Sequence, residues 1–417
     1  MSEHGSSAGC RTLTGIKIKE YGHGKGRGVI AVSPSPDKTH RSTVLYKKGD
    51  IILTVTPDIA VLYSAFASQY CAQCFLRVRG DPSSPEGLPQ YVCPTCDQFI
   101  LCADCAAALH AVADGPAGAR PSLLRVHTLA CAWYTELPAA VRAAGQDTDY
   151  LRFVLALAAT AMLEADGGVQ PSLLASLLTL DGSESSQSGE NIQFCQVFAK
   201  DKILQTFATP RLQGQKVNPA PRMRISGEDL YKVLLITKNN SLGFPFSFPT
   251  TTTSATSSNE IEIIGWSLQS TMCLLNHSCS PNAEIIFVAD SLQQQAAPAA
   301  AFLETKIKNY ANPTFELEKD TADGTQWVAL AGCMALRALR DITLQTNKNN
   351  SDASGGEGEE LTISYINLED NNGFYANHVM ERNKHLLEQY RFLCRCGLCE
   401  QQRAALRQQQ QQQQRKK

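Results

Sequence analysis

The chain has 417 residues, of which 38 are Lys or Arg and 40 are Asp or Glu. The resulting net charge of −2 gives no overall field that would hold a nucleic acid or an anionic membrane, so we expect no direct nucleic-acid binding. No apolar run approaches the roughly 20 residues that a membrane span needs, and the polar N-terminus has no secretory h-region. We therefore expect two to three domains in a protein of the nucleus and cytoplasm, with no membrane contact.

Short strands are predicted near the start of the chain. Residues 1–13 indicate a disordered N-terminus. Residues 14–20 alternate apolar and polar side chains, as half-buried strands do, and a glycine-rich turn then leads to the strand-like residues 29–32. A further β run lies at 51–56. Strands joined by turns over residues 14–66 favour a β-rich part of an α+β protein.

Residues 67–135 contain eight potential metal ligands in close pairs. Three pairs are Cys-x2-Cys and one is His-x3-Cys, and the ligands are Cys71, Cys74, Cys93, Cys96, Cys102, Cys105, His127 and Cys131. A Cys-x2-Cys turn presents two thiolates to one Zn²⁺, and four ligands complete a tetrahedral site. The block therefore predicts two zinc ions. His110 remains an alternative to His127.

Residues 136–264 predict a helical insert with flexible loops. Strong helix formers with an apolar face predict a helix over 149–165. Further helical segments are expected at 172–180, 191–208 and 228–237. The Ser/Thr tract 250–258 predicts a flexible loop.

The last part of the chain carries a second group of polar and thiol residues. Residues 274–284 read LLNHSCSPNAE and precede a β-like run at 284–288. Near the C-terminus, Cys394, Cys396 and Cys399 supply three thiolates, one short of a closed zinc site. The total of 15 cysteines is odd, which favours metal ligands over disulfides in a reducing compartment. The Gln-rich tail, residues 401–417, predicts a disordered or fraying helical end.

Three motifs, taken in this order, resemble the SET domain of protein-lysine methyltransferases. They are YGHGKGRGVIA at 21–31, the LLNHSCSPNAE segment, and EGEELTISYIN at 357–367. The cysteine block between the first and second resembles a MYND finger. The chain is thus similar, over residues 14–400, to the SET and MYND domain-containing family, in a short form without the C-terminal helical repeat domain.

The resemblance implies an α+β fold in several parts. A SET-domain β-fold (14–66 and 265–393) with a knot-like crossing is interrupted by a MYND-like zinc finger and the helical insert, and a cysteine-rich post-SET segment, 394–400, closes it. It also implies interleaved ligation in the finger. One ion would have Cys71, Cys74, Cys102 and Cys105, and the other would have Cys93, Cys96, His127 and Cys131. Cys279 would complete a third zinc site with Cys394, Cys396 and Cys399.

The resemblance further implies an enzyme that uses S-adenosylmethionine to methylate lysines of histone tails or other proteins. The cofactor-binding residues would be Lys25, Gly26, Arg27, Asn240, Asn276, His277, Tyr365 and Phe392. The catalytic residues would be Tyr365, Tyr390 and Phe392, with Tyr365 orienting the lysine amine for in-line methyl transfer and the other two walling the lysine channel.

Two other functions fit parts of the sequence. A catalytically weak adaptor would use its zinc finger to dock protein partners such as Pro-rich peptides. A cross-brace ubiquitin ligase would account for residues 71–131 but would leave the three SET-like motifs unexplained.

Overall fold

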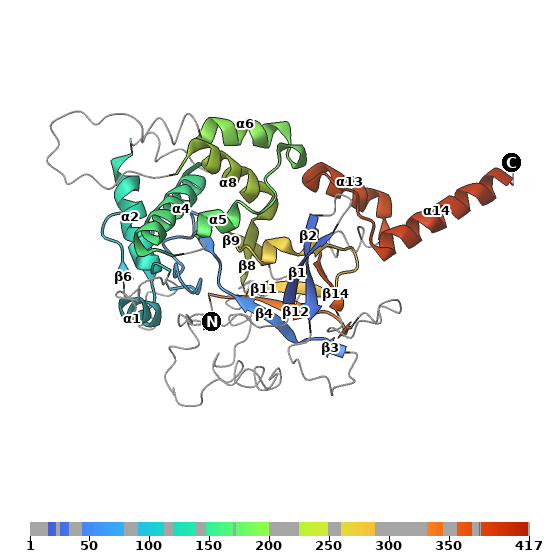
Figure 1. The fold of residues 1–417 in the computed structure, drawn as a ribbon, viewed down its shortest axis with the longest axis horizontal. Coiled ribbons are helices and arrows are strands. Elements are labelled where there is room, and N and C mark those ends of the chain that lie inside the picture. Colours follow the sequence, from blue (N-terminus) through green and yellow to red (C-terminus); the bar gives the residue numbers. More distant parts are fainter. Residues whose placement is uncertain are drawn as a thin grey trace, which may run out of the picture.

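The structure is a computed structural model, and it describes most of the chain in thirteen stretches. These are residues 16–21, 26–32, 44–78, 91–111, 120–137, 147–169, 172–199, 225–248, 260–287, 332–344, 357–368, 375 and 377–415. They form a mixed α+β fold in which several small sheets lie in the middle and helices lie to the sides (Figure 1). No helix of these stretches is both long and apolar enough to span a bilayer.

A four-stranded sheet brings together segments that are far apart in the sequence. Its strands, in spatial order, are β1 (Ile16–Tyr21), β2 (Gly26–Val32), β14 (Glu357–Ile363) and β10 (Asn276–His277). The pairs β1–β2 and β2–β14 are antiparallel, whereas β10 runs parallel to β14 and places Asn276 opposite Thr362. The strand after the glycine-rich turn, the central loop (residues 274–284) and the strand that leads to Tyr365 are therefore neighbours.

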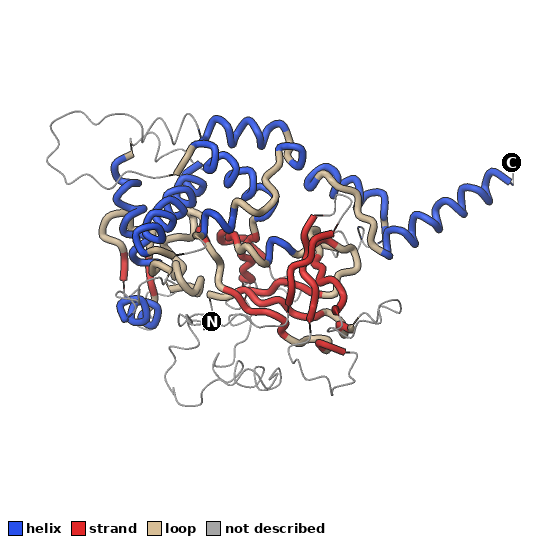
Figure 2. Tube along the Cα trace, in the orientation of Figure 1, coloured by secondary structure: helices blue, strands red, loops and turns tan. Residues whose placement is uncertain are grey.

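Four smaller sheets complete the β structure of the described residues, which Figure 2 shows in red. One contains β11 (Ala283–Phe287), β12 (Met334–Ala338) and β4 (Ile51–Val55), and another contains β5 (Ile59–Leu62), β9 (Glu260–Leu268) and β8 (Leu242–Phe248). The two-stranded sheets pair β13 (Ile342–Thr343) with β3 (Val44–Tyr46), and β6 (Tyr91–Val92) with β7 (Ile100–Leu101). Continuous apolar runs such as Val29–Ala31 and Ile52–Leu53 are buried on both faces of their strands, and Val29, Ala31, Ile52 and Leu53 belong to one shared core.

A helical region lies within residues 147–199 and 225–240, and its core also includes side chains from outside it, such as Val61 and Trp266. Its elements are α4 (Asp147–Gly167), α5 (Leu173–Leu177), the 3-10 turn η2 (Glu184–Ser186), α6 (Gly189–Val197) and α8 (Gly227–Asn240). Ser172, Ser188 and Ser226 cap three of these helices, because each hydroxyl accepts a hydrogen bond from the backbone N–H three residues later. The helices expected at 149–165 and 228–237 are confirmed, and the one expected at 172–180 is shorter. The tract 250–258 lies outside the described residues.

Helix α2 (Leu123–Glu136) joins the cysteine block to the helical insert. His127 and Cys131, spaced i and i+4, lie on one face and belong to the metal-ligand region. Val126, Ala130 and Trp133 lie on another face and are buried in the core of the insert. A single helix therefore fixes the cysteine block against the rest of the protein.

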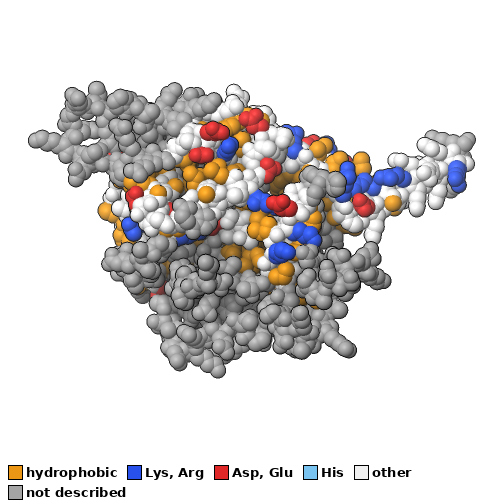
Figure 3. Space-filling view, in the orientation of Figure 1, with side chains coloured by type: hydrophobic (Ala, Val, Ile, Leu, Met, Phe, Trp, Pro, Cys, Tyr) orange, Lys and Arg blue, Asp and Glu red, His pale blue; other side chains and the backbone are white. Residues whose placement is uncertain are grey.

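The C-terminal part consists of two helices and an extended link. Helix α13 (Val379–Tyr390) ends at Arg391, which has a left-handed backbone, and α14 (Gly397–Arg415) projects from the body (Figure 1). Basic side chains gather at the start of α14 in Figure 3. The Gln-rich tail is thus helical to Arg415. The expected boundaries at 264/265 and 400/401 fall inside β9 and α14, which are continuous elements.

Candidate functional site

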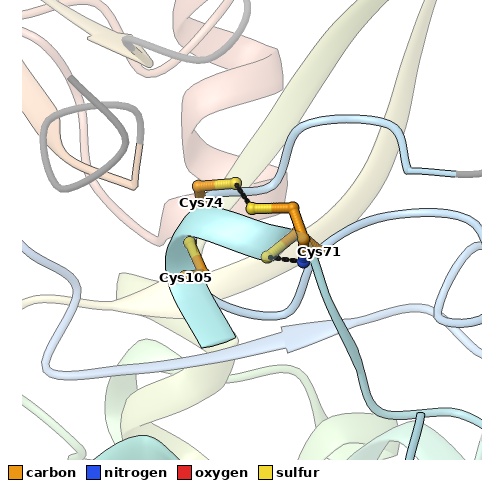
Figure 4. Close-up of side chains that lie close together, drawn as sticks. Cys71, Cys74 and Cys105 are labelled. Atoms are coloured by element: carbon orange, nitrogen blue, oxygen red, sulfur yellow. Dashed lines mark hydrogen bonds between the residues drawn. The ribbon is translucent and has the colours of Figure 1, made fainter. Parts of the chain in front are cut away.

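Four cysteines from a turn and from the start of a helix form the first metal-ligand cluster. Cys71 and Cys74 lie in the turn after β5, and Cys102 and Cys105 lie at and within α1 (Ala103–Ala111). Their sulfur atoms lie within 4.8 Å of one another, and Figure 4 shows three of these side chains facing each other. Hydrogen bonds from Cys102 and Cys105 lower the pKa of the Cys71 thiol, which favours the thiolate that a metal binds.

The second cluster contains three cysteines and one histidine. Cys93 and Cys96 follow β6, and His127 and Cys131 come from α2. Stacking on the Phe99 ring, at a centroid distance of 3.9 Å, holds the His127 imidazole in place. Hydrogen bonding from Cys131, with a further contribution from His127, lowers the pKa of Cys96 to about 3. His127 therefore occupies the ligand position, and the side chain of His110 lies outside the described part.

The distances in all three clusters fit tetrahedral zinc. A Zn²⁺ ion with Zn–S bonds of about 2.3 Å separates its sulfur ligands by about 3.8 Å, and a Cys and a His ligand by about 3.6 Å. The observed S···S distances are 3.9 Å for Cys74–Cys102, 3.8 Å for Cys93–Cys131 and 3.5 Å for Cys399–Cys279. The Cys96 Sγ to His127 Nε2 distance is 3.6 Å. Each group could hold one metal ion.

The third cluster joins the central loop to the C-terminal segment. Cys279 lies in the central loop, whereas Cys394, Cys396 and Cys399 lie in the link to α14 and in its first turn. Hydrogen bonds from Cys279 and Cys394 lower the pKa of Cys396. The cluster ties together segments more than a hundred residues apart in the sequence, as the resemblance implied.

Asn276 links three strands where they come closest together. Its Nδ2 donates to the backbone oxygen of Arg27 at 3.1 Å and to Glu360 Oε1 at 2.8 Å. A Cβ at Gly28 would lie only 2.6 Å from Asn276 Nδ2, so only glycine allows this approach. Since both acceptors fix the orientation of the amide, Oδ1 points elsewhere, and none of the described residues donates to it. Among the described residues, Asn276 Oδ1 is therefore an acceptor without a donor.

The side chain of Asn282 hydrogen-bonds the backbone of β14, as a neighbouring strand would. It is 2% exposed, accepts from the Thr362 N–H at 2.8 Å and donates to the Glu360 carbonyl at 2.8 Å. These bonds satisfy backbone groups of β14 that would otherwise be buried without partners. Asn282 therefore helps to hold the segment that leads to Tyr365.

His277 connects the third cluster to Tyr365. Its Nδ1 lies 3.0 Å from the Tyr365 backbone nitrogen and its Nε2 lies 3.2 Å from Cys279 Sγ. Burial lowers the pKa of the imidazole to about 4, so the ring is neutral at neutral pH. Both ring nitrogens are engaged within the protein.

Four aromatic rings gather at Tyr365. The ring centroids of His277, Tyr390 and Phe392 lie 5.3, 5.2 and 6.2 Å from that of Tyr365. The Tyr365 hydroxyl donates to the Leu275 carbonyl at 2.6 Å, and the Tyr390 hydroxyl donates to the Tyr365 carbonyl at 3.1 Å. Burial raises the pKa of the Tyr365 hydroxyl, so it stays protonated and can donate. The rings therefore form a half-buried aromatic wall beside the Tyr365 hydroxyl and the Leu275 carbonyl.

The other residues named as cofactor-binding lie in different surroundings. Lys25 lies outside the described residues. Gly26 begins β2 with a positive φ of 73°, and the Arg27 guanidinium donates to the backbone oxygen of Thr179 in the insert. Asn240 ends α8, and its Nδ2 donates to the carbonyls of Asp181 and Ile236. These bonds tie Asn240 to its own helix and to the loop after α5.

Sequence reasoning missed three residues that the structure places around the site. In the sequence, Asn282 is only one residue of the segment 274–284, and Glu360 is one of several acidic residues before Tyr365. Arg382 had no signal, yet it is fully buried and its Nη2 lies 3.5 Å from Cys399 Sγ. A fully buried arginine is rare unless it is paired, but burial cannot be read from one isolated position in a sequence.

No protein-family model matches the chain, and neither does any curated protein.

Proposed function

We propose that the protein is an S-adenosylmethionine-dependent protein-lysine N-methyltransferase of the SET and MYND type. Its substrates would be lysines of histone tails or of other proteins. In this proposal the parallel pairing of β10 with β14 belongs to the knot-like crossing of a SET fold. The three clusters would each hold zinc, the ion that prefers such thiolate and imidazole sets.

One observation carries the proposal. Three segments, around Arg27, Asn276 and Tyr365, meet at one place, and a thiol cluster fastens the segment carrying Tyr390 and Phe392 against them. A polar acceptor beside a half-buried aromatic wall is the combination that a positively charged methyl donor and a lysine amine need. A zinc scaffold alone would not require it.

The residues of the site would divide the chemical work. When bound, the cofactor would supply a methyl group on a sulfonium ion. Asn276 Oδ1 would accept a hydrogen bond from the ammonium group of the cofactor's methionine part. The aromatic side chains would favour a neutral lysine amine, whose pKa in water is about 10.4, because burial penalises the charged form.

Alignment and electrostatics would supply the rest. The Tyr365 hydroxyl would orient the amine for in-line attack, and the faces of Tyr390 and Phe392 would stabilise nearby positive charge by about 0.5–2 kcal/mol. The substrate ammonium would first lose a proton to water; the N–CH3 bond would then form as the S–CH3 bond breaks, and the positive charge would pass to the methylated amine, so no residue of the chain must accept a proton during methyl transfer.

The test is methylation of a whole lysate with labelled cofactor, followed by mass spectrometry of the labelled proteins. Tyr365→Phe should bind the cofactor as wild type does and lose turnover about a hundredfold, because it removes the hydroxyl oxygen that would hold the amine in place. Tyr231→Phe in α8 is the matched control, since it also removes one hydroxyl hydrogen bond, here to Glu184. Equal turnover in wild type and Tyr365→Phe would remove Tyr365 from the mechanism.

Calorimetry with the cofactor separates the enzyme from the adaptor. The enzyme should bind the cofactor, and Asn276→Ala should weaken that binding. Absence of binding to the wild-type protein, combined with capture of Pro-rich peptides through the finger, would instead support the adaptor.

A further inference from the structure

The His277 side chain stands between the third cluster and Tyr365 and contacts both. We propose that His277 is a positioning residue, which sets the backbone of Tyr365 through Nδ1 and is itself anchored to the Cys279 thiolate through Nε2. The resemblance implied a contact between His277 and the cofactor. With both nitrogens engaged, any such contact must come from the ring face or the backbone. The coupling stands apart from the proposed function, and only its effect on turnover rests on that function.

The hydrogen bonds determine where the imidazole carries its proton. A backbone N–H can only donate, so Nδ1, at 3.0 Å from the Tyr365 nitrogen, must be an acceptor. Because Nδ1 accepts, the proton of the ring lies on Nε2. That N–H points to Cys279 Sγ at 3.2 Å, and a metal-bound thiolate is an acceptor. The His277 ring therefore links the position of Cys279 to that of the Tyr365 backbone.

The His277 Nε2–H donor would stabilise the negative charge of a metal-loaded third cluster. A Zn²⁺ ion with four thiolates carries a net charge of −2, and such charge is costly to bury without donors around it. Arg382, which is 0% exposed, supplies one donor 3.5 Å from Cys399 Sγ, and Asn383 Nδ2 lies 3.7 Å from the same sulfur. Arg382 also hydrogen-bonds Cys279, so His277 is one of two donors at that sulfur.

The geometry of Tyr365 is held from two directions by this cluster. On one side, His277 accepts its backbone N–H. On the other, the Tyr390 hydroxyl donates to its carbonyl, and Tyr390 lies four residues before the ligand Cys394. The cluster therefore fixes both peptide groups that flank the Tyr365 side chain.

Two amide replacements separate the two functions of the ring. His277→Asn keeps an acceptor near the position of Nδ1 and loses the donor to Cys279. His277→Gln keeps a donor near Nε2 and loses the acceptor for Tyr365. The experiment uses the full metal-loaded chain without cofactor or substrate. It measures hydrogen exchange at single amides and the rate at which a maleimide labels Cys279 in the presence of a chelator.

The two variants should give opposite results. In His277→Gln, exchange at the Tyr365 amide should speed up about tenfold while labelling of Cys279 stays as in wild type. In His277→Asn, Tyr365 exchange should stay slow and Cys279 labelling should speed up about tenfold. The Ser278 amide, which donates to the Ile363 carbonyl at 2.9 Å, should exchange equally in all three proteins and reports that β10 still pairs with β14.

Three outcomes would overturn the proposal. Unchanged Tyr365 exchange in His277→Gln would show that Nδ1 does not hold this backbone. Unchanged Cys279 labelling in His277→Asn would show that Nε2 does not support the thiolate. Equal acceleration at Tyr365 and Ser278 in both variants would show that His277 only fills space. A failure of methylation with opposite results in the two variants would count against the proposed function alone.

Discussion

Replacement of Gly28 by alanine tests the close approach of the three strands. A Cβ at this position would lie 2.6 Å from Asn276 Nδ2 and 2.8 Å from both Glu360 Oε1 and Tyr21 Cε2. The Asn276 amide would have to move by about 0.8 Å to reach ordinary van der Waals separation. That movement would break or stretch its bonds to Arg27 and Glu360, which measure 3.1 and 2.8 Å.

The expected cost follows from those two bonds. Losing both should destabilise the fold by about 1–3 kcal/mol, and the stiffer unfolded chain of the alanine variant should return about 0.4–1 kcal/mol. We therefore expect a net loss of about 1–2 kcal/mol in urea unfolding and weaker cofactor binding in calorimetry. Gly189→Ala is the control, because a Cβ added there would meet no atom within 4 Å. If Gly28→Ala unfolded and bound cofactor like wild type, the packing of Asn276 described above would be wrong.

Two further predictions concern charge. Elemental analysis should find three zinc ions per chain. Arg382→Met should speed the loss of one of these ions to a chelator, because Arg382 lies against the third cluster. Lys384 is an exposed cation on the same helix, so Lys384→Met should not speed this loss, and equal zinc retention in both variants would contradict the role of Arg382. Burial opposes ionisation of Glu359, but its hydrogen bonds to Arg340, at 2.6 and 2.9 Å, lower its pKa. The stabilisation from this pair is therefore fully present above the ordinary carboxyl pKa and is lost as the pH falls below it, through the lowered pKa of Glu359. Arg340→Met should cost about 1 kcal/mol in urea unfolding at pH 7 and less near pH 3, and a difference independent of pH would argue against the pair.

Elements with a regular pattern could be predicted from the sequence, and elements stabilised by distant contacts could not. The apolar face of residues 149–165 predicted a helix that the structure extends to Asp147–Gly167. The two-residue strand β10 has no periodicity of its own and exists because it pairs with β14. The Gln-rich tail was expected to be a disordered or fraying helical end; glutamine is a good helix former, and α14 continues through the tail to Arg415.

The candidate site shows the same division. Cys-x2-Cys spacing reveals ligands locally, because a short turn can present two thiolates to one ion. The partnership of Cys279 with the thiols at 394–399 came from the resemblance, since nothing in local spacing links them. Asn282 and Arg382 escaped notice because each bonds to groups, such as the Glu360 carbonyl and the Cys399 sulfur, that are distant in sequence and brought close only by folding.

The long span of the third cluster has a consequence for how the protein is made. Cys279 leaves the peptidyl-transferase centre 115 residues before Cys394 (394 − 279). At about 5–20 residues per second, the central loop must wait about 6–23 s before its partner thiols exist. During that interval Cys279 and the His277 donor have no closed site, so zinc supply and thiol protection in the producing cell should affect the yield of folded protein more than they affect the finished molecule.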